Sequence, residues 1–145
     1  MKKLIDVLAY IRKVYSTNAF VNLTGQKIDA VTCGEAQLSI MIEQEKHTNL
    51  YGVIHGGVFG ALADTAFGVA CATLGVRVVT VSFAMNLIKN MHAGKHLIAK
   101  AKVVHHGRTT LVVKVTMFNE EGDNLAEVIG TMLNIGTFDE IPQKW

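Results

Sequence analysis

Apolar residues recur at helical spacing in two segments of the chain. The first segment predicts a short amphipathic helix over residues 3–15. Its apolar positions are Leu4, Ile5, Leu8, Ile11 and Val14. The second is a nearly unbroken apolar run between Gly57 and Gly75, which is too long for one strand, lacks proline and is rich in alanine. We expect this run to form a central helix that is thin enough for a sheet to wrap closely around it.

Alternating apolar and polar residues, typical of half-buried strands, fill most of the remaining chain. A short strand at 28–31, a turn at 33–35 and a strand over 38–42 precede the central helix. Residues 16–25 and 43–49 are polar and predict loops. Four long strands are expected after the helix, at 79–87, 97–103, 111–117 and 125–135. Because no helical pattern separates them, we predict an antiparallel meander and an α+β fold with one long helix held in a curved sheet.

Length and composition indicate one folded domain spanning residues 1–145. The formal net charge is only +2 and the basic residues are scattered, which argues against a nucleic-acid partner. Cys33 and Cys71 lack metal-ligand spacing and are expected to be free thiols in a reducing cytoplasm. Asp6, Arg12 and Lys13 interrupt the N-terminal apolar residues, so a signal peptide is not expected.

Asp64 is the single acid within the central helix. A lone carboxylate among apolar side chains is costly to bury, so it needs a partner, a wet cleft or a chemical role. One structural alternative is a transmembrane helix, which the central Asp64 and the flanking His55 and Arg77 disfavour. The other is a core helix whose buried acid is capped. We favour a catalytic acid.

Gly56 and Gly57 at the start of the helix allow a ligand to approach backbone N–H groups and the positive end of the helix dipole. Such a place suits an anion or the oxyanion of a reacting carbonyl. At 1.5 Å per residue, Asp64 lies roughly 10 Å along the axis from Gly57, whereas a base must lie about 3 Å from its target atom. We therefore predict an obligate homodimer in which Asp64 of one subunit faces the paired glycine amides of the other.

Three further residues near the helix could contribute to chemistry, and each also has a structural explanation. Asn49 could orient a water or a carbonyl, or form a turn. His55 could act as acid or base, or bind the exposed backbone ends of the helix. Ser82, on a strand expected beside the helix, could hold a water next to Asp64, or merely lie on a polar strand face.

Cationic and polar residues at the strand ends could contact phosphates or form solvated turns. They are Lys89, Asn90, His106, Gly107, Arg108 and Thr109. The sequence contains no motif for serine, metal or nucleotide hydrolases, so no metal site is predicted.

The stretch from Asn49 through His55-Gly56-Gly57 to Asp64 resembles the signature of the hotdog-fold acyl-CoA thioesterases of the phenylacetate-pathway type, relatives of the 4-hydroxybenzoyl-CoA thioesterases. The similarity extends from about Phe20 to the last strand. This resemblance implies a curved antiparallel sheet around one helix, dimers with a continuous sheet, and often tetramers built from two dimers. It also implies hydrolysis of acyl-CoA to acid and free coenzyme A without a metal. Coenzyme A is then part of the substrate, so no separate cofactor is expected.

The resemblance also assigns roles to residues of this chain. Asp64 matches the catalytic acid, as nucleophile or as the base that activates water, and Gly56 matches the amide donor to the thioester oxygen, with Gly57 beside it. The remaining matches are Asn49 and His55 shaping that end of the site, Ser82 positioning water, and Lys89, Asn90 and the turn 106–109 touching the nucleotide end of coenzyme A. Gly68 departs from the pattern, because some relatives carry Thr or Ser at this position, one helical turn after the acid. The resemblance therefore does not predict which acyl group the substrate carries.

Two other functions on the same fold remain alternatives. One is a non-catalytic acyl-CoA-binding protein, although relatives that act as sensors usually carry an extra DNA-binding segment. The other is a hydratase or dehydratase, which needs Asp and His at a different spacing, and His55 is the only histidine at the helix entrance.

Overall fold

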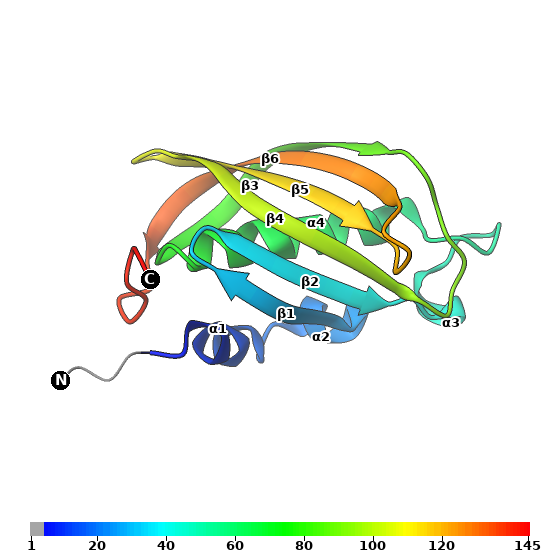
Figure 1. Ribbon diagram of the computed structural model, residues 1–145, viewed down its shortest axis with the longest axis horizontal. Helices are drawn as coiled ribbons and strands as arrows, with labels where there is room; N and C mark the ends of the chain where they lie inside the picture. The colour runs from blue at the N-terminus through cyan, green and yellow to red at the C-terminus, as the bar shows by residue number, and fades with distance from the viewer. Residues whose placement is uncertain (1–4) are drawn as a thin grey trace.

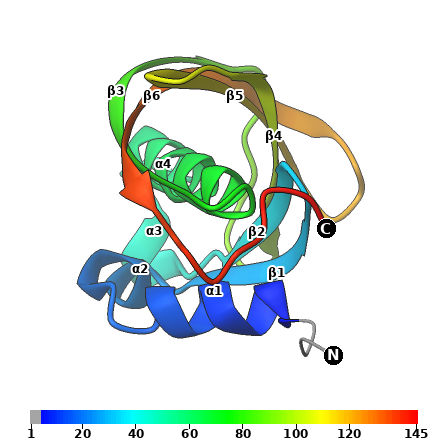
Figure 2. The ribbon, with the colours of Figure 1, turned by 90° about the vertical axis from the view of Figure 1, so that its left-hand side faces the viewer.

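The computed structural model describes residues 5–145, which form a six-stranded antiparallel sheet around a long helix (Figure 1). The elements in chain order are α1 (Val7–Tyr15), α2 (Ala19–Thr24), β1 (Gln26–Thr32), β2 (Glu35–Met41), α3 (Gln44–His47), α4 (Gly56–Ala72), β3 (Val76–Leu87), β4 (His96–His106), β5 (Thr110–Phe118) and β6 (Asn124–Thr137). Figure 2 shows α4 in the concave side of the sheet, with α1 and α2 on the side that the sheet leaves open. The predicted α+β architecture is confirmed.

The strand order is β1-β2-β4-β5-β6-β3. The predicted meander is confirmed for β4, β5 and β6, but it is wrong for β3, which pairs with β6 rather than with β4. The physical reason is that β2 already occupies the other edge of β4. Residues 88–95 therefore carry the chain from the edge strand β3 to the inner strand β4, and one edge of β3 has no partner strand within the described chain.

Helix α4 supplies the centre of the core. Phe59, Leu62 and Phe67 are fully buried, and the ring of Phe67 lies so close to β6 that a Cβ atom at Gly130 would be 2.6 Å from it. The small glycine therefore permits this close approach. The chain leaves α4 through Gly75, whose φ of 76° is the left-handed conformation expected of a residue that ends a helix.

One face of α4 is not covered by the sheet of its own chain. The residues on it that are not buried include Gly57, Gly60, Ala61, Asp64 and Gly68, which are three or four positions apart. Residues at this spacing share one side of a helix. The small side chains on this face leave room for another backbone to approach α4 closely.

The N-terminal helix predicted over residues 3–15 begins at Val7, where Asp6 caps it by accepting a hydrogen bond of 3.0 Å from the Ala9 amide. Residues 3 and 4 lie outside the described chain. The loop predicted over residues 16–25 is wrong, because α2 forms there. Asn18 caps α2 by accepting from the Val21 amide at 3.1 Å, and Gly25 ends it with a φ of 75°. The polar residues that suggested a loop are thus the caps of a short helix.

The segment 43–49, also predicted as a loop, contains the single-turn helix α3. Its last residue, His47, is 2% exposed. The Nδ1 atom of His47 accepts from the Glu43 amide at 2.9 Å, and its Nε2 lies 2.8 Å from the carbonyl of Thr24. A buried imidazole therefore ties α3 to the end of α2 and fixes the chain that leads to α4.

Strand β3 exposes several large apolar side chains in the single chain. They are Val79, Val81, Phe83 and Leu87, followed by Ile88 just beyond the strand. An exposed, apolar edge strand without a partner strand is a typical place for pairing with another chain. None of the helices in residues 5–145 is both long and apolar enough to span a membrane.

Candidate active site

Asp64 lies on the uncovered face of α4 and is exposed in the single chain. Its Oδ1 atom accepts a hydrogen bond of 2.5 Å from the hydroxyl of Thr80 on β3. The same hydroxyl lies 3.4 Å from the sulfur of Met132 on β6. The second carboxylate oxygen of Asp64 has no hydrogen-bond partner among residues 5–145. The carboxylate is thus held in place from one side and open on the other.

Thr80 is a neighbour of Asp64 that the sequence pattern did not predict, since Ser82 was expected beside Asp64. A β-bulge between Thr80 and Ser82 adds one residue to β3 relative to β6. Because of it, both Thr80 and Phe83 face α4, with the Phe83 ring packed on Phe67, and Ser82 lies on the other side of the strand. Within the single chain the adjacency of Ser82 to Asp64 is therefore wrong, and a catalytic role for Ser82 stays a prediction.

Of the two glycine amides at the start of α4, one has a hydrogen-bond acceptor within residues 5–145 and the other has none. His55 is the N-cap residue, and its Nδ1 accepts a hydrogen bond of 2.9 Å from the Gly57 amide. The Val58 amide donates to the His55 carbonyl at 2.9 Å. The Gly56 amide donates to no group in the described part of the chain. Gly56 is therefore the available donor of the glycine pair, and His55 has the structural role of a cap.

Asn49 and Asn90 shape the loop that leads into α4. The Asn49 side-chain oxygen accepts from the amides of Tyr51 and Val53, at 2.9 and 3.3 Å. The Asn90 side chain pairs with the backbone of Ile54, accepting at 3.1 Å and donating at 2.9 Å. Both amides thus fix the backbone immediately before His55 and Gly56.

A comparison with protein families matches residues 51–126, which include His55, the glycine pair, Asp64 and Thr80, to the thioesterase superfamily. The chain belongs to this superfamily. Its reaction is therefore the hydrolysis of a thioester, and the expected family and fold are confirmed.

Individual relatives agree with this assignment. The acyl-coenzyme A thioesterase PaaI of Escherichia coli is 28% identical over 85% of this chain and 87% of its own length. Its structure, with 27% identity, superposes with a TM-score of 0.84 over 90% of this chain and 94% of that one. A thioesterase protein of Streptococcus pneumoniae, solved with coenzyme A, has 30% identity and a TM-score of 0.73 over 77% and 90% of the two chains. The TT0310 protein of Thermus thermophilus has 33% identity and a TM-score of 0.74 over 80% and 97%.

The residues expected at the nucleotide end of coenzyme A lie in two separate places on the thioesterase. Lys89 follows β3 near the start of α4 and forms an ion pair of 2.9 Å with Asp123. The turn 106–109, with His106, Gly107, Arg108 and Thr109, lies at the opposite end of the sheet, where the Asn134 amide donates to the Thr109 carbonyl at 2.9 Å. One chain therefore does not bring these two groups together.

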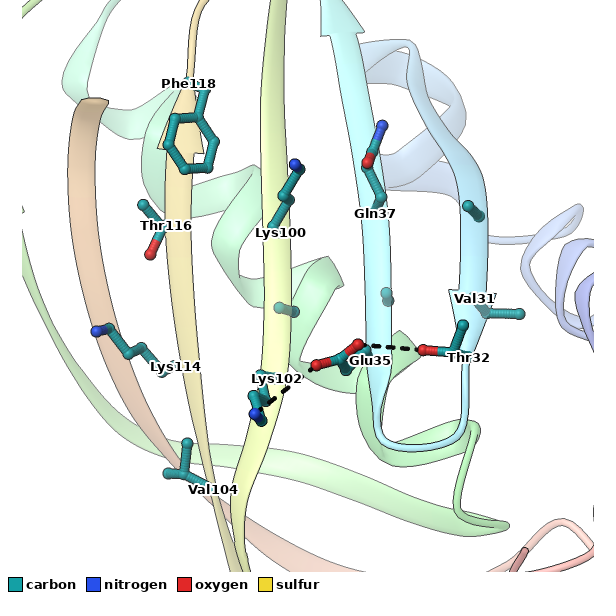
Figure 3. A pocket seen from close by; sticks show the side chains of 13 residues that line it. Val31, Thr32, Glu35, Gln37, Lys100, Lys102, Val104, Lys114, Thr116 and Phe118 are labelled. Atoms are coloured by element: carbon teal, nitrogen blue, oxygen red, sulfur yellow. Dashed lines mark hydrogen bonds and ion pairs between the residues drawn. The ribbon is translucent and has the colours of Figure 1, made fainter. Parts of the chain in front are cut away.

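The thioesterase also has a cavity of about 490 Å³ on the outer face of β1, β2, β4 and β5 (Figure 3). Lys100, Lys102 and Lys114 line it, and Lys102 lies 3.9 Å from a carboxylate oxygen of Glu35. Helix α4 lies behind the sheet, on the other face, and none of the expected site residues lines this cavity. The cavity therefore lies apart from the residues that are expected to react.

No group of three or more histidine, cysteine or acidic side chains within residues 5–145 is arranged to hold a metal ion. The residues near Asp64 offer a carboxylate, a hydroxyl and backbone amides. These groups are suited to acid–base or nucleophilic catalysis with electrostatic stabilisation of an oxyanion.

Proposed function

We propose that this thioesterase hydrolyses an acyl-CoA thioester to the free acid and coenzyme A, with Asp64 as the catalytic carboxylate and Gly56 as the amide donor to the thioester oxygen. The observation that carries the proposal is the position of the Asp64 carboxylate, which lies on the uncovered face of α4 and accepts a hydrogen bond of 2.5 Å from Thr80. The first amide of the same helix, that of Gly56, has no acceptor within the described chain. Coenzyme A is part of the substrate, and no resident cofactor or metal is required.

The named relatives support this substrate class. One of them is called an acyl-coenzyme A thioesterase, and another was solved with coenzyme A. Two further structures of the Streptococcus pneumoniae protein carry alanine in place of an aspartate and of a threonine 16 positions after it. Asp64 and Thr80 have the same separation here. This agreement supports the pair as part of the reaction site.

The site is shared between two subunits in our proposal. Gly56 and Asp64 lie about 12 Å apart along one helix axis, which is too far for both to act on one carbonyl. The uncovered face of α4 and the unpaired apolar edge of β3 are both available to a second copy. A two-fold axis would bring the Gly56 amide of one subunit to Asp64 of the other, and give two sites per dimer.

Antiparallel pairing of two β3 strands across this axis would also bring together the two groups expected at coenzyme A. The start of one β3 would lie beside the end of the other. The turn 106–109 of one subunit would then approach Lys89 and Asn90 of its mate. We propose that these residues bind the phosphates of coenzyme A at the dimer interface, and that two dimers assemble into a tetramer in the cytoplasm, where Cys33 and Cys71 stay reduced.

In the proposed reaction, attack on the thioester carbon moves negative charge onto the carbonyl oxygen, and the Gly56 amide stabilises that charge preferentially. Asp64 either attacks the carbon to form an anhydride, which water then hydrolyses, or removes a proton from the attacking water. The hydrogen bond from Thr80 fixes one oxygen of Asp64 and directs the other toward the substrate.

Replacing Asp64 tests the proposed function directly. We expect Asp64→Ala and Asp64→Asn to lower kcat for thiol release at least about 100-fold, because both remove the charged nucleophile or base. The measurement is the release of free coenzyme A from a panel of aliphatic and aromatic acyl-CoA substrates. Thiol release at an unchanged rate in Asp64→Ala would overturn the proposal, and the panel would identify the acyl group that the wild-type protein prefers.

A further inference from the structure

Tyr15 of α1 reaches the uncovered face of α4 at Gly68. A Cβ atom built at Gly68 would lie 2.7 Å from the Tyr15 hydroxyl and 4.0 Å from the ring carbon that bears it. The hydroxyl thus occupies the space that a side chain at position 68 would otherwise fill. Only glycine at this position allows the phenol to lie against the helix in this way.

The space filled by this hydroxyl is next to Asp64. Residues four positions apart are neighbours on one helix face, with Cβ atoms about 5–6 Å apart, and the Cα–Cβ bond of residue 68 points toward the preceding turn. Asp64 stands on that turn. The Tyr15 hydroxyl therefore lies on the same part of this face as Asp64, and the influence of Asp64 on the pKa of Tyr15 agrees with this proximity.

Both groups have an unused hydrogen-bonding atom. The Tyr15 hydroxyl forms no hydrogen bond within the described chain, and Thr80 occupies only Oδ1 of Asp64, which leaves Oδ2 open. Burial, together with the nearby Cys71 and Asp64, raises the pKa of Tyr15 to about 12. The phenol therefore keeps its proton at neutral pH and can donate to a water oxygen or accept from a water hydrogen.

We propose that Tyr15 is a positioning residue, whose hydroxyl orients the water that Asp64 activates. This inference rests on the proposed function and assigns Asp64 the role of general base. Asp64 takes a proton from the water, whose oxygen forms the new bond to the thioester carbon. The carbon–sulfur bond then breaks, and the proton passes from Asp64 to the departing sulfur, which gives the acid and free coenzyme A. The Tyr15 hydroxyl holds the water in line without gaining or losing a proton overall.

Two substitutions test this role: one removes the hydroxyl at Tyr15, and the other supplies a hydroxyl from position 68 of α4. Tyr15→Phe keeps the ring and deletes the oxygen, so we expect kcat to fall about 10-fold, the effect of one lost hydrogen bond in the transition state, with KM unchanged. Gly68→Ser alone places its Cβ 2.7 Å from the Tyr15 hydroxyl and should also lower kcat. In the double variant the Phe ring leaves 4.0 Å of space, so the serine hydroxyl introduced by Gly68→Ser can take over and kcat should recover.

The matched control is Tyr10→Phe on the same helix. The Tyr10 hydroxyl donates to Glu140 at 2.8 Å and the Tyr10 ring packs against Phe138, so loss of this hydroxyl should leave kcat unchanged. All variants are assayed for thiol release from acyl-CoA, with thermal unfolding measured in parallel. An unchanged kcat in Tyr15→Phe overturns the inference, as does a double variant that unfolds like the wild type but recovers no kcat. If the wild-type protein releases no thiol from acyl-CoA, or if the Asp64→Ala variant releases thiol at the wild-type rate, the proposed function is overturned instead.

Discussion

The hydrogen bond between Thr80 and Asp64 is the most informative contact at the scale of single residues. It joins β3 to α4 and fixes one oxygen of a carboxylate that is otherwise exposed. An exposed carboxylate can adopt several rotamers, and a base or nucleophile must be held in one of them to react efficiently. Thr80 restricts Asp64 to the orientation that leaves Oδ2 free for the substrate or for water.

Removing the Thr80 hydroxyl is therefore expected to slow the reaction. We predict that Thr80→Val, which keeps the shape of the side chain, lowers kcat about 10-fold or more, whereas Thr80→Ser retains most of the activity. Ser82→Ala is the comparison variant, because Ser82 is the hydroxyl that the sequence pattern favoured, and its effect should be smaller. A larger loss in Ser82→Ala than in Thr80→Val, measured as kcat for thiol release, would contradict this role of Thr80.

The sequence predicted Asp64 and the glycine pair as site residues but did not predict the contact between Thr80 and Asp64, and the reason is local. Alternation along β3 assigns Thr80 and Ser82 to one face and Val79, Val81 and Phe83 to the other. The bulge between Thr80 and Ser82 reverses the faces after it, so that Thr80 and Phe83 both meet α4. A bulge depends on the register with β6, which alternation along one strand does not contain.

At the scale of elements, the start of α4 is built so that a single amide remains available. His55 binds the Gly57 amide through Nδ1 at 2.9 Å, while Asn49 and Asn90 hold the backbone that precedes it. The cap and the loop thus leave the Gly56 amide without an acceptor among residues 5–145. A preorganised donor of this kind stabilises an oxyanion without reorganising during the reaction.

Gly56→Pro tests this amide selectively. Proline has no N–H but is well accepted at the first position of a helix, and His55 before it already has the extended backbone that precedes proline, with φ of −62° and ψ of 134°. We expect kcat to fall roughly 100-fold to 1,000-fold, the usual effect of losing an oxyanion donor.

Gly56→Ala is the matched control for that substitution. It keeps the amide, and its Cβ would lie at an ordinary distance of 3.5 Å from Leu87. The alanine variant should therefore stay near the wild-type kcat. Equal activity in the proline and alanine variants would show that the Gly56 amide does not stabilise the oxyanion.

The elements themselves were largely predictable, and the errors have physical causes. The central helix and the last four strands follow from apolar periodicity, which packing against one core enforces. Helix α2 was missed because its caps, Asn18 and Gly25, are also typical loop residues. The place of β3 at the edge was missed because strand order is set by the competition of β2 and β3 for β4, a contact between distant parts of the chain.

At the scale of the whole molecule, the single chain leaves three complementary features uncovered. These are the apolar edge of β3, the small-residue face of α4, and the proposed catalytic carboxylate of Asp64, which lies far from the Gly56 amide of its own chain. A two-fold dimer would satisfy all three at once: the edge would pair, the helix face would be covered, and each Asp64 would meet the Gly56 amide of its mate. In the proposed dimer, each reaction site is therefore divided between two subunits.

Subunit complementation tests this division most directly. Asp64→Ala and Gly56→Pro chains are each expected to be inactive as homodimers, but a mixed dimer would contain one intact site, formed by Asp64 of the proline variant and Gly56 of the alanine variant. Refolding the two variants together at equal concentration should produce mixed dimers as about half of the population. We therefore predict thiol release at about one quarter of the wild-type rate, since each mixed dimer has one working site of two. A mixture that contains mixed dimers and yet releases no more thiol than the separate variants would contradict a shared site.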